Sequence, residues 1–182
     1  MKSKKPTKKK LNMTLLNQDF IEVSEKSYNF SGFEVTRDTG KISYIKEYLD
    51  GSEIGKISFR PTSEPLIFSV VYQDGYIEQR YNNGGVSCVY NYVGGHLQGE
   101  YRRYDIAGDL QARTFYHEST DITPDIMSFI GFSGSNEEFT KYEFSTDELF
   151  NISMRYGSFF KFNHELKRSS ARFDEIVRNC LA

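Results

Sequence analysis

Glycine recurs at short intervals between residues 39 and 108 of this 182-residue chain, each time in a dipeptide typical of tight turns. These dipeptides are Thr39-Gly40, Asp50-Gly51, Asp74-Gly75, Asn83-Gly84, Gly94-Gly95 and Ala107-Gly108. They predict β-hairpins, because hairpin turns need a positive backbone φ that glycine adopts without steric cost. The longest gap between two of them contains residues 60–65, where two prolines predict a loop.

Between these dipeptides polar and apolar residues alternate with a period of two. In one segment the first face holds Val86, Cys88, Tyr90 and Tyr92, and in another it holds Leu66, Phe68, Val70 and Tyr72. This period is typical of a β-strand with one face toward a core and one toward solvent. Such segments, with turns roughly ten residues apart, predict a long antiparallel β-meander over residues 13–120. The aromatic content of 15% also favours strands.

One part of this pattern resembles a known family. Residues 95–104 read Gly-His-Leu-Gln-Gly-Glu-Tyr-Arg-Arg-Tyr, and they are followed by Ala107-Gly108-Asp109-Leu110 and then Phe115-Tyr116. This order resembles the MORN-repeat variant of small bacterial proteins, which include a family of antitoxins. Weaker copies begin at Gly40, Asp50 and Asp74, so that the resemblance spans about residues 38–120. It implies successive hairpins that pack only against their neighbours, with caps at the ends.

The period changes after residue 120. Thr123-Pro124-Asp125 predicts the start of a short helix that ends before Gly131, because proline is well tolerated in a first helical turn. Ser145 and Glu148 have the spacing of a capping box, and Gly157 predicts the end of that second helix. A last, amphipathic helix is predicted from His164 to Cys180. Its apolar stripe holds Leu166, Ser169, Phe173, Ile176, Val177 and Cys180.

The expected fold is therefore α+β and mainly β. An antiparallel β-meander of MORN-variant-like hairpins is followed by C-terminal helices, within residues 121–182, that pack on the sheet as a cap. A helix that docks into a partner is the alternative for the last element. A one-layer sheet cannot hide both faces, so we expect the face without helices to be the binding surface.

A basic tail precedes an acidic body. Residues 1–12 are predicted to be a disordered tail, and its lysines are Lys2, Lys4, Lys5, Lys8, Lys9 and Lys10. The whole chain has a net charge of −2, which leaves 17 basic and 25 acidic residues, or a net charge of −8, over residues 11–182. The tail is interpreted as a solubility segment; contact with nucleic acid or an anionic membrane is the alternative.

Neither export nor membrane insertion is predicted. The apolar stretch at residues 11–16 is too short for a secretory signal, and no segment reaches the roughly 18 apolar residues of a spanning helix. A cytoplasmic location is therefore expected. Cys88 lies in an alternating segment and Cys180 at the end of a helical pattern, so buried thiols are favoured over a disulfide.

The sequence predicts no enzyme, metal or cofactor. His96, His117 and His164 have no ligand at metal-binding spacing. Gly131-Phe132-Ser133-Gly134-Ser135 looks like a nucleophile elbow, but its spacing is wrong and no strand leads into it. Asp121, Asp125, Glu137 and Glu138 are interpreted as a solvated acidic loop. Catalytic residues can still assemble from distant strands, which leaves an enzyme as a third possibility.

Two functions from different classes remain. The first is a non-catalytic binding protein, an inhibitor, antitoxin or immunity protein of phage, plasmid or bacterium, that presents an acidic, tyrosine-rich surface to a toxin or host effector. The second is a scaffold tethered to a membrane or nucleic acid by the lysine tail. The candidate binding residues are Tyr90, Tyr92, Tyr101, Arg102, Tyr104 and Tyr116. Tyrosine and arginine are favoured at protein interfaces, although each tyrosine could also be a core or cross-strand residue. Arg102 and Arg103 are expected on opposite faces of their strand.

Overall fold

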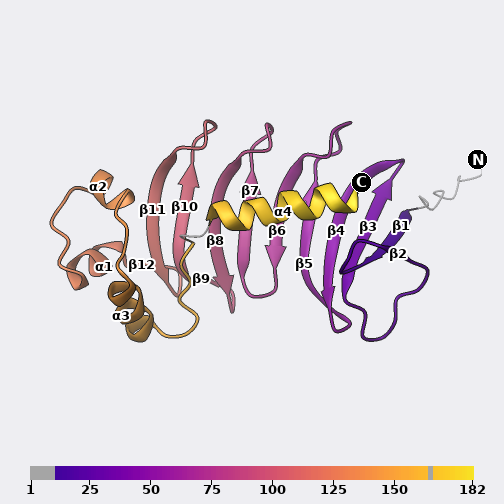
Figure 1. Cartoon of the computed structure of the whole chain (residues 1–182). Helices are drawn as coiled ribbons and strands as arrows, with labels where there is room; N and C mark the ends of the chain where they lie inside the picture. Colours follow the sequence, from indigo (N-terminus) through magenta and orange to yellow (C-terminus); the bar gives the residue numbers. More distant parts are fainter. Residues whose placement is uncertain (1–10, 164–165) are drawn as a thin grey trace, which may run out of the picture.

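The computed structural model of the chain describes residues 11–163 and 166–182, which form twelve strands followed by four helices (Figure 1). The strands are β1 (Asn12–Asn17), β2 (Glu22–Val23), β3 (Gly32–Asp38), β4 (Lys41–Leu49), β5 (Ser52–Phe59), β6 (Ile67–Tyr72), β7 (Tyr76–Arg80), β8 (Val86–Val93), β9 (His96–Leu97), β10 (Gly99–Tyr104), β11 (Leu110–His117) and β12 (Thr120–Asp121). The helices are α1 (Thr123–Phe129), α2 (Asn136–Thr140), α3 (Thr146–Tyr156) and α4 (Leu166–Cys180).

The strands form a single antiparallel sheet in the order β12-β11-β10-β8-β7-β6-β5-β4-β3-β1-β2, and β9 pairs with β8 beside this path. The predicted antiparallel β-meander with C-terminal helices is confirmed. The order departs from the chain order at two places: β1 lies between β2 and β3, and β10 follows β8 directly because β9 pairs with β8 beside this path. β1 begins at Asn12, the last residue of the predicted tail, and the six lysines lie outside the described residues.

Two glycines show how the turns and crossings depend on backbone freedom. Asp50 and Gly51 both have positive φ, 49° and 81°, which is the conformation of a type I′ hairpin turn. Gly99 has φ +89°, and a Cβ added there would lie 2.1 Å from the carbonyl oxygen of Lys161. The Glu100 amide donates to that carbonyl at 2.7 Å. Glycine at position 99 therefore lets the segment after α3 cross the start of β10.

α4 lies across the strands on one face of the sheet (Figure 1), here called the covered face. Beneath it runs a lateral row of cross-strand partners, Val35, Ile45, Ile57 and Val70, of which none is more than 2% exposed. From α4, Phe173, Ile176 and Cys180 pack onto this row, as the predicted stripe requires. Burying a side chain of this size contributes about 1.5–3 kcal/mol, so the contact holds the helix on the sheet.

The other three helices close the β11 end of the sheet. Phe115 of β11 is fully buried among Ile126, Phe139, Ile152 and Phe160, which come from α1, α2, α3 and the segment after α3. The rings of Phe115 and Phe160 stack with centroids 6.2 Å apart. This second core caps the β11 edge of the sheet. Its helices do not cover the central strands on the face opposite α4.

The interpretation of four acidic residues as a solvated loop is right about their exposure and wrong about the loop, since Asp121 lies in β12 and Asp125 in α1, and it missed one helix. Glu137 and Glu138 lie in the first turn of α2. Ser135 caps this helix: its hydroxyl accepts from the Glu138 amide, and the Glu138 carboxylate accepts from the Ser135 amide. A helix of five residues is too short to show a 3.6-residue period, which is why only the cap could have revealed it.

The expected face of Phe68 is also wrong. Ser58 pairs with Ser69, but the next partner of β5, Phe59, pairs with Ile67, so Phe68 is the extra residue of a β-bulge. The bulge reverses the alternation at this point. Ile67 is therefore in the core at 4% exposed, whereas Phe68 is 49% exposed with the Arg60 guanidinium 5.0 Å from its ring centroid.

Candidate functional site

The face of the sheet opposite α4, here called the open face, carries its own lateral row. Lys56, Val71, Ile77 and Tyr90 are successive cross-strand partners on β5 to β8. The covered row continues from Val70 to its partners Glu78 on β7 and Val89 on β8. Each open-face residue is next in the chain to a member of the covered row, so its side chain points to the other side. Val71 is 46% exposed. Within the described residues, the buried clusters that contain helix residues draw only on the covered face.

Three tyrosines extend the open-face row across β8, β10 and β11. The Tyr90 and Tyr101 rings stack with centroids 5.8 Å apart and an interplanar angle of 26°. Tyr101 meets Tyr116 edge-on at 6.2 Å and 82°. Aromatic pairs of this kind contribute about 0.5–1.5 kcal/mol beyond their burial, so the rings form a preordered platform. Tyr90, Tyr101 and Tyr116, with the 48% exposed Tyr92 beside them, are here called the tyrosine platform.

Tyr90 and Tyr101 of the platform are uncharged at neutral pH. Burial raises the pKa of Tyr101 to about 12, with a smaller contribution from the neighbouring Cys88. Burial also raises the pKa of Tyr90. Each phenol therefore keeps its proton and can donate a hydrogen bond to an incoming group.

The structure places four of the six predicted binding residues together and separates the other two. Arg102 and Tyr104 lie on the covered face, because Arg102 pairs with Val89 of the covered row. The Arg102 Nε donates to the buried Glu100 carboxylate at 2.5 Å. Burial raises the pKa of Tyr104. Neither side chain can join the tyrosine platform.

Sequence reasoning missed the cation that borders the platform. Arg103 pairs with Cys88 and lies on the open face. Lys56 lies on the same face but three strands from Tyr90, with its Nζ 4.5 Å from the centroid of the Tyr44 ring. The only sequence signal for Arg103 was the alternation of side chains along β10. It places the neighbouring arginines on opposite faces, but it does not show which face is open. Among residues that β6, β7, β8, β10 and β11 place on the open face, none is Asp or Glu. On these five strands the surface around the tyrosines is therefore not the acidic one that was expected; Glu34 lies on the same face at β3.

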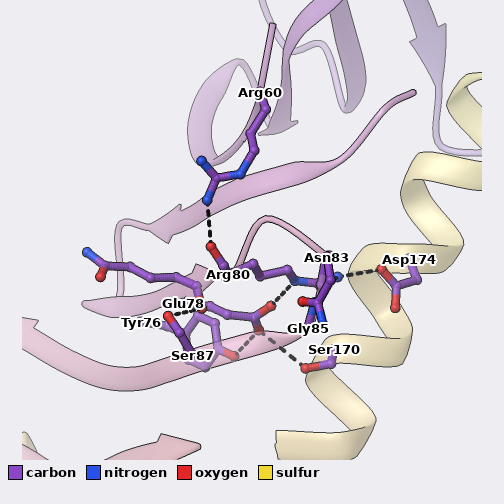
Figure 2. A network of polar contacts seen from close by, with 11 residues as sticks. Arg60, Tyr76, Glu78, Arg80, Asn83, Gly85, Ser87, Ser170 and Asp174 are labelled. Carbon is purple, nitrogen blue, oxygen red and sulfur yellow. Dashed lines mark hydrogen bonds and ion pairs between the residues drawn. The ribbon is translucent and has the colours of Figure 1, made fainter. Parts of the chain in front are cut away.

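Buried charges on the covered face fix α4 in place (Figure 2). The fully buried Glu78 carboxylate accepts from Arg80 Nε at 2.6 Å and from the Tyr76 hydroxyl at 2.8 Å. Arg80 also donates to Asp174 of α4 at 2.8 Å, and Ser170 of α4 donates to Glu78 at 3.4 Å. Figure 2 shows these groups converging between β7 and the helix. The carboxylate is occupied by structural partners and points away from solvent, so we assign it no catalytic role.

A second buried carboxylate, Glu100, joins β10 to β11 and to the segment after α3. Its Oε1 accepts from Arg113 Nε at 2.7 Å, in addition to Arg102. Its Oε2 accepts from the Asn163 amide at 2.7 Å, and the Asn163 side chain accepts from Asn91 at 3.1 Å. Burial lowers the pKa of the Arg113 guanidinium although Glu100 opposes this change. Glu100, like Glu78, is therefore a buried carboxylate on the covered face that holds neighbouring segments together through hydrogen bonds and ion pairs.

The described residues contain no other arrangement with evident chemistry. No group of three or more His, Cys, Asp or Glu side chains in this part of the chain could hold a metal ion. Ser135, from the segment that looks like a nucleophile elbow, is the cap of α2. Both cysteines are buried free thiols, as predicted. No helix of residues 11–163 or 166–182 is long and apolar enough to cross a membrane.

Comparisons with protein-family models, with curated proteins and with solved structures gave no match to this chain. A function must therefore be argued from the site itself.

Proposed function

We propose that this chain is a non-catalytic protein-binding module that occludes a partner effector with its open face, in the manner of an inhibitor, antitoxin or immunity protein. The observation that carries the proposal is the contrast between the two faces. α4 seals one face with an apolar stripe and buried ion pairs, while the other presents the tyrosine platform to solvent. Tyrosine is enriched in protein interfaces because it supplies a large contact area at little cost in conformational entropy.

The open face has the dimensions of a protein interface. Six strands from β5 to β11 lie side by side beyond β3 and β4, where Phe30 of the loop before β3 packs on Tyr48 and Lys26 pairs with Glu34. At about 4.8 Å per strand and about 20 Å per strand length, these six strands offer roughly 500 Å² of flat area. A standard interface covers about 800 Å² on each partner, so this face with its border suffices for a specific complex.

The charges around the platform define the partner surface that it fits. Arg103 borders the tyrosines, and its guanidinium needs acceptors once water is excluded. We therefore infer a partner surface that is apolar at its centre and carries carboxylates or free carbonyls at its rim. The resemblance to MORN-repeat variants is part of the same proposal, and it is supported by the unbroken hairpin order from β3 to β8.

The proposal is tested by capture of a partner from native host extract on the full chain. A Tyr90→Ser/Tyr101→Ser variant removes the stacked pair, and Tyr28→Ser is the matched control because Tyr28 is 96% exposed on the loop between β2 and β3. We expect a stoichiometric partner with the wild type and the control but not with the double variant. Central interface tyrosines contribute about 2 kcal/mol or more each, about 30-fold in affinity. Recovery of the same partner by all three proteins, or of none at low salt, contradicts the proposal.

A second candidate is binding of single-stranded nucleic acid, because Arg103 borders the stacked tyrosines on a face without carboxylates in its central strands. Proteins that bind single strands combine aromatic stacking platforms with positive charge. The lysine tail would add to this attraction and would also serve a membrane-tethered scaffold. Anisotropy of a labelled oligothymidine at two salt concentrations tests it, with the full chain and with residues 1–10 deleted. Salt-dependent binding that the Tyr90→Ser/Tyr101→Ser variant abolishes supports this function; an unchanged anisotropy excludes it.

A further inference from the structure

The outer side of β11 is only partly paired. β12 pairs with Tyr116 and His117 alone. At Phe115 the outward amide donates to the Thr123 hydroxyl at 2.9 Å, and the outward carbonyl accepts from the Ile122 amide at 2.8 Å. No strand of residues 11–163 and 166–182 pairs with the outer side of residues 110–114. Alternate residues direct their backbone groups to the same side, so the amide and carbonyl of Arg113 point outward like those of Phe115.

A groove of about 830 Å³ runs beside this unpaired edge. Its walls are Asp109 and the β11 residues 110–114 on one side and α1 and α2 on the other, with Met127 and Phe139 among the apolar lining residues. An exposed strand edge is a template for another strand, and proteins use it to bind extended peptides. Five residues of β11 offer about 17 Å of edge, enough for a segment of similar length.

The charges that line the groove indicate which kind of peptide segment it could bind. Asp109, Asp121 and Glu137 line the groove, and Lys141 is the cation opposite them. Arg113 also lines it, but its guanidinium is paired with Glu100 at 2.7 Å. The lining is therefore acidic, unlike the open face. A basic segment would bring its own cations to these carboxylates and its backbone to the β11 edge.

We propose that the groove along β11 binds an extended, lysine- or arginine-rich segment of another protein, which adds to the sheet as a further strand. This site is separate from the tyrosine platform and goes beyond the function proposed for the open face. A partner that covers the open face and also inserts such a segment would contact the module at two places, and the second contact would raise its affinity through effective concentration.

The test uses the full ¹⁵N-labelled chain and one synthetic probe, an acetylated and amidated peptide with four Lys-Val repeats and a fluorophore. We expect saturable binding by anisotropy and slower hydrogen exchange of the Arg113 amide. The Asp109→Asn/Glu137→Gln variant should weaken binding about fivefold, since it removes two exposed ion pairs that each contribute only modestly. Asp19→Asn/Glu25→Gln is the matched control: it removes the same charge at exposed positions outside the groove and should not change the affinity.

A peptide methylated on alternate backbone nitrogens separates strand addition from simple charge attraction, because it cannot complete the ladder of hydrogen bonds. We expect it not to bind. Equal binding of the methylated peptide, an unchanged affinity for the Asp109→Asn/Glu137→Gln variant, or no binding at millimolar concentration overturns the proposal. So does a dimer in sedimentation velocity that the peptide dissociates, since a second copy would then occupy the edge. The Tyr90→Ser/Tyr101→Ser variant should bind the peptide normally, so this proposal and that for the open face can fail separately.

Discussion

Replacing Glu78 by Gln tests whether the buried charges beneath α4 stabilise the covered face. The Glu78 side chain is 0% exposed and that of its partner Arg80 is 5% exposed. Removing one partner of a buried ion pair typically lowers the free energy of unfolding by about 3–5 kcal/mol, because the other charge then stays buried without compensation. Arg80 keeps its contact with Asp174, whose side chain is 53% exposed and which therefore compensates by only about 0–1 kcal/mol. The expected loss in the free energy of unfolding is therefore about 3 kcal/mol.

The double variant Glu78→Leu/Arg80→Met gives the opposite expectation. Glu78 pairs with Val70 and Val89, which are both fully buried, so a leucine there continues the apolar row. Replacing a whole buried ion pair by apolar residues of similar size is often neutral or stabilising. We expect the free energy of unfolding of this double variant to lie within about 1 kcal/mol of the wild type. It removes the same carboxylate as Glu78→Gln, but it leaves no buried charge behind.

Urea unfolding followed by far-ultraviolet circular dichroism measures both variants, and an unchanged slope of free energy against urea shows that the same surface unfolds. A Gln variant within about 0.5 kcal/mol of the wild type would show that the ion pair contributes as little as a surface pair. A double variant less stable than the Gln variant would show that the polar network, and not the apolar row, dominates beneath the helix.

Three further predictions concern single residues. Gly99→Ala should lower the free energy of unfolding in urea by at least about 2 kcal/mol, because the added Cβ would clash with the Lys161 carbonyl. Gly94→Ala is the control, since Gly94 has φ +59° but open space around it, and it should lose about 1 kcal/mol. Equal losses in the two variants would refute the clash. The Cys180 thiol, whose pKa burial raises to about 12, should resist a thiol reagent at pH 8 until the chain unfolds, so rapid labelling of the native chain would contradict its burial. Because burial raises the pKa of Tyr101 to about 12, above about 10 in the unfolded chain, its contribution to stability should be complete below about pH 10 and lost as pH rises toward 12. Unfolding of the wild type and a Tyr101→Phe variant across this range should show a smaller alkaline loss in the variant, and identical losses would contradict the assignment.

Local backbone requirements made the hairpins predictable. Each hairpin turn needs positive φ, and a dipeptide such as Asp50-Gly51 indicates the turn from its own residue types, whatever the distant residues are. The cap of α3 was equally legible, since the Ser145 hydroxyl accepts from the Glu148 amide three residues later. In both cases the partners that decide the structure are near neighbours in the chain.

Features that depend on distant partners could not be predicted. Arg80 meets Asp174 across 94 positions of sequence, so the burial of Glu78 beside it had no local signal. For the same reason the alternation around Arg102 could not say which face α4 covers, and two of the six candidate residues fell on the wrong side. The bulge at Phe68 also escaped, because it depends on pairing between β5 and β6.

The most direct test of the open face as a recognition surface is hydroxyl-radical footprinting of the complex with the captured partner. Tyr92, which is 48% exposed in the free chain, and Tyr90 and Tyr101 beside it should lose reactivity on binding. Tyr28, which is 96% exposed on the loop between β2 and β3 and is not part of the tyrosine platform, should react at the same rate in both states. Protection at Tyr28 or along α4, with Tyr92 as reactive as before, would contradict the assignment of the open face.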